Sequence, residues 1–168
     1  MTARAHDAEH EYSKGDRALQ GATWARFGVA LVAIAGAVLL VVAELSPLLA
    51  VRAGDVVVKT VKTGPHHSWA GLVIAIAAVP LALGVARTGA RPALAALVLL
   101  GALSLGIALL GDLPDIHKTG VIGDEFEAAA AHARVGIYLE TLGAALLVVA
   151  GGVGLLLVGV RSSRRVTA

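Results

Sequence analysis

Residues 27–43 read FGVALVAIAGAVLLVVA, an apolar run without a single charge. Three further uncharged apolar blocks follow at residues 69–86, 92–111 and 141–160. The hydrocarbon core of a bilayer is ~30 Å thick, so a helix that rises about 1.5 Å per residue crosses it in ~20 residues. Each block is apolar on every side and shows no single apolar stripe, which is typical of a helix surrounded by lipid. The sequence therefore predicts four transmembrane helices.

The composition agrees with a membrane protein and excludes several classes of function. Of the 168 residues, 57% are hydrophobic and 15% are charged, whereas a soluble domain has about 25% charged residues. No cysteine is present, which excludes disulfide scaffolds, thiolate metal sites and thiol catalysis. The sequence also lacks glycine-rich phosphate loops, a Ser-His-Asp arrangement and the H-E-x-x-H motif. We therefore expect neither an enzyme nor a bound cofactor.

The four blocks divide the chain into a membrane domain and two tails. The predicted spans cover about residues 24–46, 68–87, 92–112 and 138–160, so that residues 24–160 form one transmembrane domain. Residues 1–23 are mostly polar and are predicted to be a disordered tail. Residues 161–168 form a short basic tail. The expected fold class is an all-α membrane protein, a four-helix bundle with two outer loops.

The distribution of Lys and Arg predicts the orientation of the bundle. Nine of these residues lie on the side of the two termini: Arg4, Lys14, Arg17, Arg26, Arg87, Arg91, Arg161, Arg164 and Arg165. Five lie on the other side: Arg52, Lys59, Lys62, Lys118 and Arg134. Because positive residues favour the cytoplasmic side, we expect both termini in the cytoplasm. The excess of Arg over Lys and the many Ala, Gly and Val residues indicate a G+C-rich bacterium, and hence its plasma (inner) membrane.

The two outer loops are each predicted to contain short structure. Residues 49–63 are rich in β-branched residues and include Ala53-Gly54 as a turn, which predicts a β-hairpin. In the second loop, residues 118–123 are expected to be extended, and Asp124 with Glu127 forms a capping box that predicts a surface helix over residues 125–133. The first loop is mainly positive and the second mainly negative, which favours contact between them. Independent, solvated loops are the alternative.

One titratable residue lies at the outer edge of each span. Glu44, His67, Asp112 and Glu140 are each about twenty residues from the opposite end of their helix, so all four lie at the same depth, ~30 Å from the inner boundary. Further polar residues lie just beyond: His66, Asp115, His117 and His132. Imidazole and carboxylate together suit Zn²⁺, Cu²⁺, Mn²⁺ or Fe²⁺. The four residues are therefore candidate metal ligands.

An ordinary interfacial role is the alternative for these four residues. A helix end is where polar residues begin, so each could extend to water, cap a helix, or pair with Arg52, Lys118 or Arg134. Glu140 differs because its neighbours are apolar and because a carboxylate facing lipid is costly. We therefore expect Glu140 to point into the bundle and to find a partner there.

Three segments carry a resemblance to a known group of proteins. They are Asp112-Leu113-Pro114-Asp115, residues 119–123 with the sequence TGVIG, and residues 138–143 with the sequence YLETLG. Over residues 112–143 the chain resembles small, uncharacterised four-span membrane proteins of G+C-rich bacteria, so the resemblance implies no activity, ligand or site. In outline the chain is also similar to claudin-like tetraspans, but it lacks the paired cysteines of that family.

Three functions compete at this point. The first is a non-enzymatic tetraspan that organises or accompanies other envelope proteins through its outer loops. The second is a small oligomeric transporter or channel with the outer acidic and His residues at its entrance, and the third is an outer-face metal-binding protein. The expected partners are the lipid bilayer, a protein bound through the outer loops and further copies of the chain. Nucleic-acid binding is not expected, because the charges of the N-terminal tail cancel.

Overall fold

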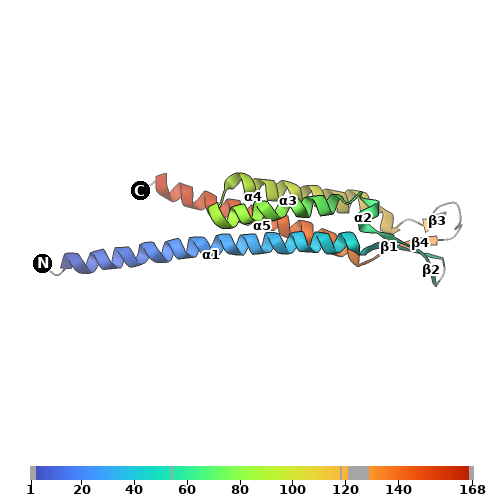
Figure 1. Ribbon diagram of the computed structural model, residues 1–168, viewed down its shortest axis with the longest axis horizontal. Coiled ribbons are helices and arrows are strands. Elements are labelled where there is room, and N and C mark those ends of the chain that lie inside the picture. The colour runs from blue at the N-terminus through green and yellow to red at the C-terminus, as the bar shows by residue number, and fades with distance from the viewer. Residues whose placement is uncertain (1–2, 54, 118, 121–128, 167–168) are drawn as a thin grey trace.

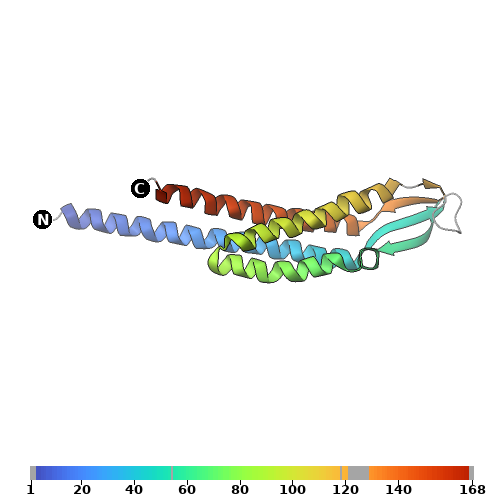
Figure 2. The ribbon, with the colours of Figure 1, turned by 90° about the horizontal axis from the view of Figure 1, so that it is seen from above.

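The fold is a bundle of four long helices with a small β-sheet at one end (Figures 1 and 2). The computed structural model describes residues 3–53, 55–117, 119–120 and 129–166. Its long helices are α1 (Ala3–Leu45), α3 (Ala70–Thr88), α4 (Arg91–Gly106) and α5 (Val135–Val166). Both termini lie at one end of the bundle, here called the terminal end, and the sheet lies at the other, the loop end.

Four helical segments are long and apolar enough to cross a membrane, the third of them formed by α4 together with the π-helical turn at Ile107–Asp112 that follows it. These segments are Thr23–Leu45, Ala70–Thr88, Arg91–Asp112 and Val135–Gly159. They agree with the spans predicted from the sequence to within three residues at each boundary. The fold is thus that of a multi-pass membrane protein.

The helices form a closed ring in which α1 and α4 each contact both α3 and α5. Glycine allows the closest approaches within the ring. A Cβ atom on Gly36 of α1 would lie 2.8 Å from the carbonyl oxygen of Gly143 in α5, and one on Gly101 of α4 would lie 2.8 Å from that of Ala144. Small residues therefore bring the backbones of neighbouring helices together, as is common in membrane bundles.

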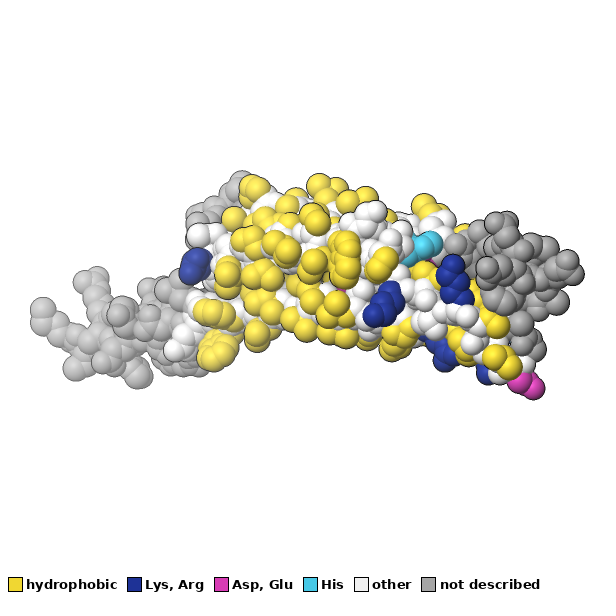
Figure 3. All heavy atoms as spheres, turned by 45° about the vertical axis from the view of Figure 1, so that its right-hand side comes forward, with side chains coloured by type: hydrophobic (Ala, Val, Ile, Leu, Met, Phe, Trp, Pro, Cys, Tyr) yellow, Lys and Arg dark blue, Asp and Glu magenta, His cyan; other side chains and the backbone are white. Residues whose placement is uncertain are grey.

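The outer surface of the helices is strongly apolar. Leu31, Val73 and Leu110 are 66%, 65% and 82% exposed, and many other large apolar side chains share this surface. Figure 3 shows hydrophobic side chains covering the middle of the visible face, with Lys and Arg side chains toward its two ends. Such a surface would be costly in water, whereas hydrocarbon accommodates it without penalty.

The N-terminal tail continues the first span as a helix. Helix α1 begins at Ala3, whereas the sequence predicts a disordered tail over residues 1–23. The tail contains Ala, Glu, Lys and Arg, which are good helix formers. Because the span already supplies a helical nucleus, each added residue avoids the cost of helix nucleation.

The loop end carries a four-stranded antiparallel sheet with the strand order β2-β1-β4-β3. Strands β1 (Pro47–Ala53) and β2 (Val56–Lys62) form the hairpin predicted for the first loop. Strand β4 (Ala129–Ala133) pairs with β1, and the two-residue β3 (Thr119–Gly120) pairs with β4. The predicted contact between the two loops is therefore confirmed, and it is made by backbone hydrogen bonds.

The surface helix predicted over residues 125–133 is wrong where the structure describes it. Residues 129–133 form strand β4 instead, and the proposed capping residues Asp124 and Glu127 lie outside the described residues. Alanine favours a helix locally, but β1 offers β4 a complete ladder from Leu49↔Ala133 to Ala53↔Ala129. The predicted all-α class is therefore correct for the helix bundle, but the loop end contains a β-sheet.

Three short helical elements connect the sheet to the bundle. They are α2 (Thr63–His66), which follows β2, the π-helix η1 (Ile107–Asp112), which extends α4, and the 3₁₀-helix η2 (Leu113–His117). A small apolar cluster under the sheet, formed around Leu48, Leu49 and Ile137, anchors this end. The four residues predicted as metal ligands lie just beneath it.

Candidate metal centre

The structure brings the four predicted residues together at the loop end of the bundle. Glu44 comes from the end of α1, His67 follows α2, Asp112 ends η1, and Glu140 lies in the first turns of α5. The three carboxylates are almost completely buried, with exposed fractions of 3% for Glu44, 0% for Asp112 and 3% for Glu140. His67 interacts electrostatically with all three. Four segments of the chain thus each contribute one residue to a single polar cluster at the loop end.

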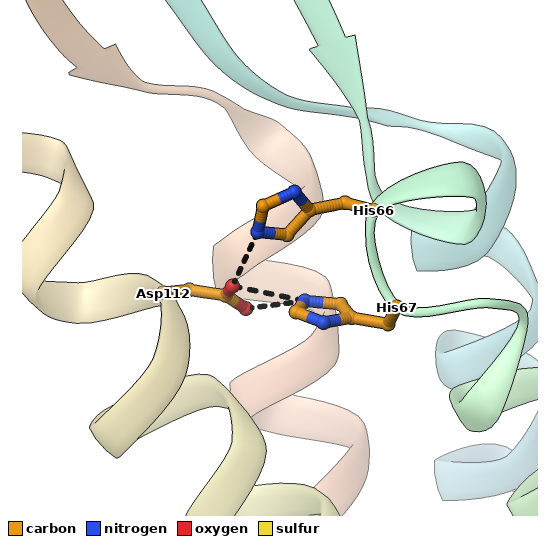
Figure 4. A group of neighbouring side chains, drawn as sticks. All are labelled: His66, His67 and Asp112. Atoms are coloured by element: carbon orange, nitrogen blue, oxygen red, sulfur yellow. Dashed lines mark hydrogen bonds and ion pairs between the residues drawn. The ribbon is translucent and has the colours of Figure 1, made fainter.

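Asp112 is at the centre of this cluster, facing two adjacent histidines (Figure 4). Its two carboxylate oxygens each lie 2.9 Å from Nε2 of His67. Nε2 of His66 is 3.7 Å from Oδ1 of the same carboxylate. The two imidazole rings meet edge to face, with centroids 4.7 Å apart. Both Nε2 atoms are therefore directed at one carboxylate.

The π-helix η1 explains why Asp112 points into the bundle. Ser104, Ala108 and Asp112 are spaced by four residues and all three are buried. In an α-helix, each four-residue step overshoots a full turn by about 40°, so two steps would rotate Asp112 away from the buried face. The wider π-turn, closed by i→i+5 hydrogen bonds, offsets this rotation between Ala108 and Asp112. The polar side chain therefore stays on the inner face of the helix.

A strained turn holds the two histidines in place. Thr63, at the start of α2, is anchored to the end of α1 because its backbone N–H and its Oγ1 both donate to the carbonyl oxygen of Ser46. After the histidines, Ser68 and Trp69 have φ values of 52° and 64°, which are unfavourable for residues other than glycine. Such strain persists only where the surrounding structure enforces it, and it is frequent at functional sites.

Glu44 has a structural task in addition to its place in the cluster. Its Oε1 accepts a hydrogen bond of 3.2 Å from the backbone N–H of Leu72, in the first turn of α3. A carboxylate at this position satisfies a free N–H group and stabilises the positive end of the helix. Gly71 leaves room for this interaction, since an added Cβ would displace the Glu44 carboxylate. Glu44 thus caps the start of α3, which is one of the interfacial roles considered for it in the sequence analysis.

Glu140 is 3% exposed, as expected of a residue that points into the bundle, but its Oε2 lacks the expected hydrogen-bond partner. Three carboxylate oxygens in the cluster are buried without a hydrogen-bond partner: Glu44 Oε2, Asp112 Oδ1 and Glu140 Oε2. Among the described residues, the only ion pairs to these carboxylates come from His66 and His67. The predicted ion pairs of these carboxylates with Arg52 or Arg134 are not found among the described residues. Lys118, the third predicted partner, is not one of the described residues. Negative charge therefore exceeds positive charge in a buried site.

The carboxylates also change the protonation of His67. The hydrogen bond with Asp112 raises the pKa of His67 above its ordinary value of 6.5, and the negative charges of Asp112, Glu140 and Glu44 add to this effect against the opposing effect of burial. The site thus favours positive charge at the His67 ring. A proton supplies one unit of that charge, and a metal ion bound to Nε2 supplies two.

His66, His67 and Asp112 fit a metal ion as a group. Each offers one ligand atom, and these atoms all lie within 4.8 Å of one another. Ligands bound to Zn²⁺ at about 2.0–2.2 Å in a tetrahedron are about 3.3 Å apart, so small side-chain rotations would complete the geometry. His66 belongs to this group, although the sequence analysis did not place it in the candidate set. His132 is exposed on β4, and the side chains of Asp115 and His117 lie outside the described residues.

Comparisons of the chain with protein-family models, with curated proteins and with solved structures found no match. The resemblance of residues 112–143 to four-span bacterial membrane proteins therefore stays a prediction. Any statement on function rests on the chemistry of the cluster itself.

Proposed function

We propose that the chain is a multi-pass membrane protein that binds a divalent transition-metal ion at the loop end of its bundle. The observation that carries this proposal is the convergence of His66, His67 and Asp112, with all ligand atoms within 4.8 Å of one another. The carboxylate of Asp112 is fully buried and faces Nε2 of both histidines, at 2.9 Å for His67 and 3.7 Å for His66, and a buried charge is stable only when it is paired or bound to a metal. A dication bound between these three residues would meet that requirement.

The ligand types indicate which ions the site accepts. Two imidazoles and one carboxylate suit borderline ions such as Zn²⁺, Mn²⁺, Fe²⁺ and Co²⁺. Cu⁺ prefers sulfur ligands, and Ca²⁺ and Mg²⁺ prefer sites made of oxygen alone. With three protein ligands, a fourth position remains for water or an exogenous ligand, as in zinc sites that exchange or activate a bound group.

The site opens toward the loop end. The exposed side-chain fraction falls from 35% at His66 to 12% at His67 and 0% at Asp112, so an ion would enter past His66. The excess of Lys and Arg at the terminal end supports a cytoplasmic location of the termini, and hence an outward-facing metal site in a bacterial plasma membrane. Labelling of an appended C-terminal tag only after the membrane is opened would support this orientation, and labelling of intact cells would contradict it.

Metal content and affinity test the proposal directly. The full chain, purified in detergent with a tag that lacks histidine, is expected to bind one equivalent of Zn²⁺ or Co²⁺ by elemental analysis and calorimetry. His67→Ala removes a ligand and should weaken binding by more than the about 10–100-fold that loss of an outer-shell group costs. His132→Ala, which removes an exposed histidine from β4, is the matched control and should bind as the wild type does. Equal affinity in all three proteins, or no binding by the wild type, would refute the proposal.

A second candidate function is the organisation of other envelope proteins through the sheet. Strand β2 is an edge strand, and its Val56 and Val57 are 65% and 42% exposed. An open edge with apolar side chains can accept a further strand from another chain. A photo-crosslinking residue at Val57 should then capture one defined protein in cells, whereas the same residue at the exposed Val79 of α3 should not. Identical products at both positions would contradict this role.

The transporter alternative has less support, because the described titratable cluster lies at the loop end and not midway along the spans.

A further inference from the structure

The two buried glutamates of the cluster differ in what already engages them. Glu44 uses one oxygen to cap α3 through the N–H of Leu72, so a structural reason accounts for its position. No hydrogen bond of this kind to the backbone is found for Glu140 among the described residues. Its interactions are with Asp112, His67 and Glu44, and its Oε2 is buried without a partner. The position of Glu140 is therefore not explained by capping or by pairing with Arg or Lys.

The surroundings make an unexplained carboxylate costly. Glu140 lies on α5 beside the apolar cluster of Leu48, Leu49 and Ile137, and only 3% of its surface is exposed. Burial of a carboxylate without a partner disfavours its charged form. With Glu44 and Asp112 nearby, the cluster holds three acidic groups against two imidazoles. A dication at the histidines would offset two of these three negative charges.

On the basis of the proposed metal site, we infer that Glu140 is a positioning residue for the ion: it acts through Asp112 and determines how strongly the site prefers a dication. Glu140 is outside the group of three ligands whose atoms all lie within 4.8 Å of one another, so it is not a member of the direct ligand set. Its carboxyl group is buried close enough to that of Asp112 for their charges to affect each other, and the groups around a metal-ligating side chain tune the ion that it binds. Glu140 thus joins the span α5 to a site whose ligands come from α2 and η1.

Replacement of each glutamate by its neutral isostere tests this inference. Glu140→Gln should lower the affinity for Zn²⁺ by about 10–100-fold and reduce the preference for Zn²⁺ over Mg²⁺. Glu44→Gln is the matched control: it also removes one buried charge from this end, but the amide oxygen can still accept from Leu72. It should change the affinity by less than Glu140→Gln does. The d–d absorption of bound Co²⁺ should shift in Glu140→Gln, because the carboxylate of Asp112 is no longer held in the same orientation.

Two further measurements separate a positioning role from a general structural role. The thermal stability of the metal-free Glu140→Gln protein should equal or exceed that of the metal-free wild type, since an unpaired buried charge has been removed. Glu140→Asp, which keeps the charge on a shorter side chain, should bind Zn²⁺ more tightly than Glu140→Gln and keeps the test valid if the amide variant fails to fold.

The outcomes distinguish this inference from the proposed function. If the wild type binds Zn²⁺ and His67→Ala does not, but both glutamate variants bind as the wild type does, the inference is refuted and the metal site stands. The inference is also refuted, with the metal site intact, if Glu44→Gln and Glu140→Gln lose equal affinity. If the wild type binds no metal, the proposed function fails and the inference fails with it.

Discussion

The middle of the bundle and its loop end are built on different principles. In the middle, glycine and alanine bring helix backbones into contact, as at Gly36 and Gly143, and the described part of this region holds no titratable side chain. At the loop end, three buried acids and two histidines meet beside a π-helix and a turn with positive φ at Ser68 and Trp69.

This difference separates the packing that stabilises the fold from the polar cluster that is proposed to bind a metal ion. Close apolar packing between helices lowers the free energy of the folded state. Buried charges and backbone strain raise it, and they persist only where other contacts enforce them. The middle of the bundle therefore supplies the stability on which the polar loop end depends, and substitutions in the two regions should have different consequences.

The largest effect on stability is expected from Gly143→Leu in the middle of the bundle. A Cβ at this position would lie 2.8 Å from the carbonyl oxygen of Gly36 and 3.1 Å from the backbone N of Leu40, so α1 and α5 would have to separate. We expect a loss of about 3 kcal/mol, at the upper end of the usual cost of overpacking, measured by denaturation in detergent. Gly152→Leu is the control, since nothing lies within 4 Å of its added Cβ. Equal stability of both variants would contradict the proposed packing.

An intermediate effect is expected from Glu44→Ala at the loop end. This change removes the acceptor for the N–H of Leu72 at the start of α3, and loss of such a cap costs about 1 kcal/mol. Glu44→Gln should lose less, because its side-chain oxygen remains. Thermal melting of the metal-free proteins measures the difference. If alanine and glutamine variants melt together below the wild type, the charge of Glu44 matters more than its cap.

The smallest effect is expected from pH, through His67. Its pKa is raised by the hydrogen bond with Asp112 and by the surrounding carboxylates, so the protonated ring stabilises the folded state. That contribution is fully present below the ordinary pKa of about 6.5 and is lost as the pH rises through the raised value. The metal-free wild type should therefore lose stability toward alkaline pH relative to His67→Gln, while His132→Gln should follow the wild type. A constant difference between wild type and His67→Gln at all pH values would refute this expectation.

Sequence reasoning located much of the candidate site but not its arrangement. Glu44, His67, Asp112 and Glu140 could be selected because each ends or begins an apolar block at one depth. The place of His66 in the ligand group was not foreseen, because it depends on the turn that follows α2. Strand β4 was also missed, since five residues rich in alanine indicate a helix until a partner strand is present.

The amino-acid sequence alone determined that the chain has four apolar helices and which end of each carries a titratable group, because helix length and hydrophobicity are local properties that a bilayer selects directly. Only the tertiary structure decided that these groups face one another. Their convergence depends on the rotation of each helix about its axis, on the π-turn that redirects Asp112, and on the pairing of β1 with β4 across the two loops. These are contacts between residues far apart in the chain, and no local pattern encodes them.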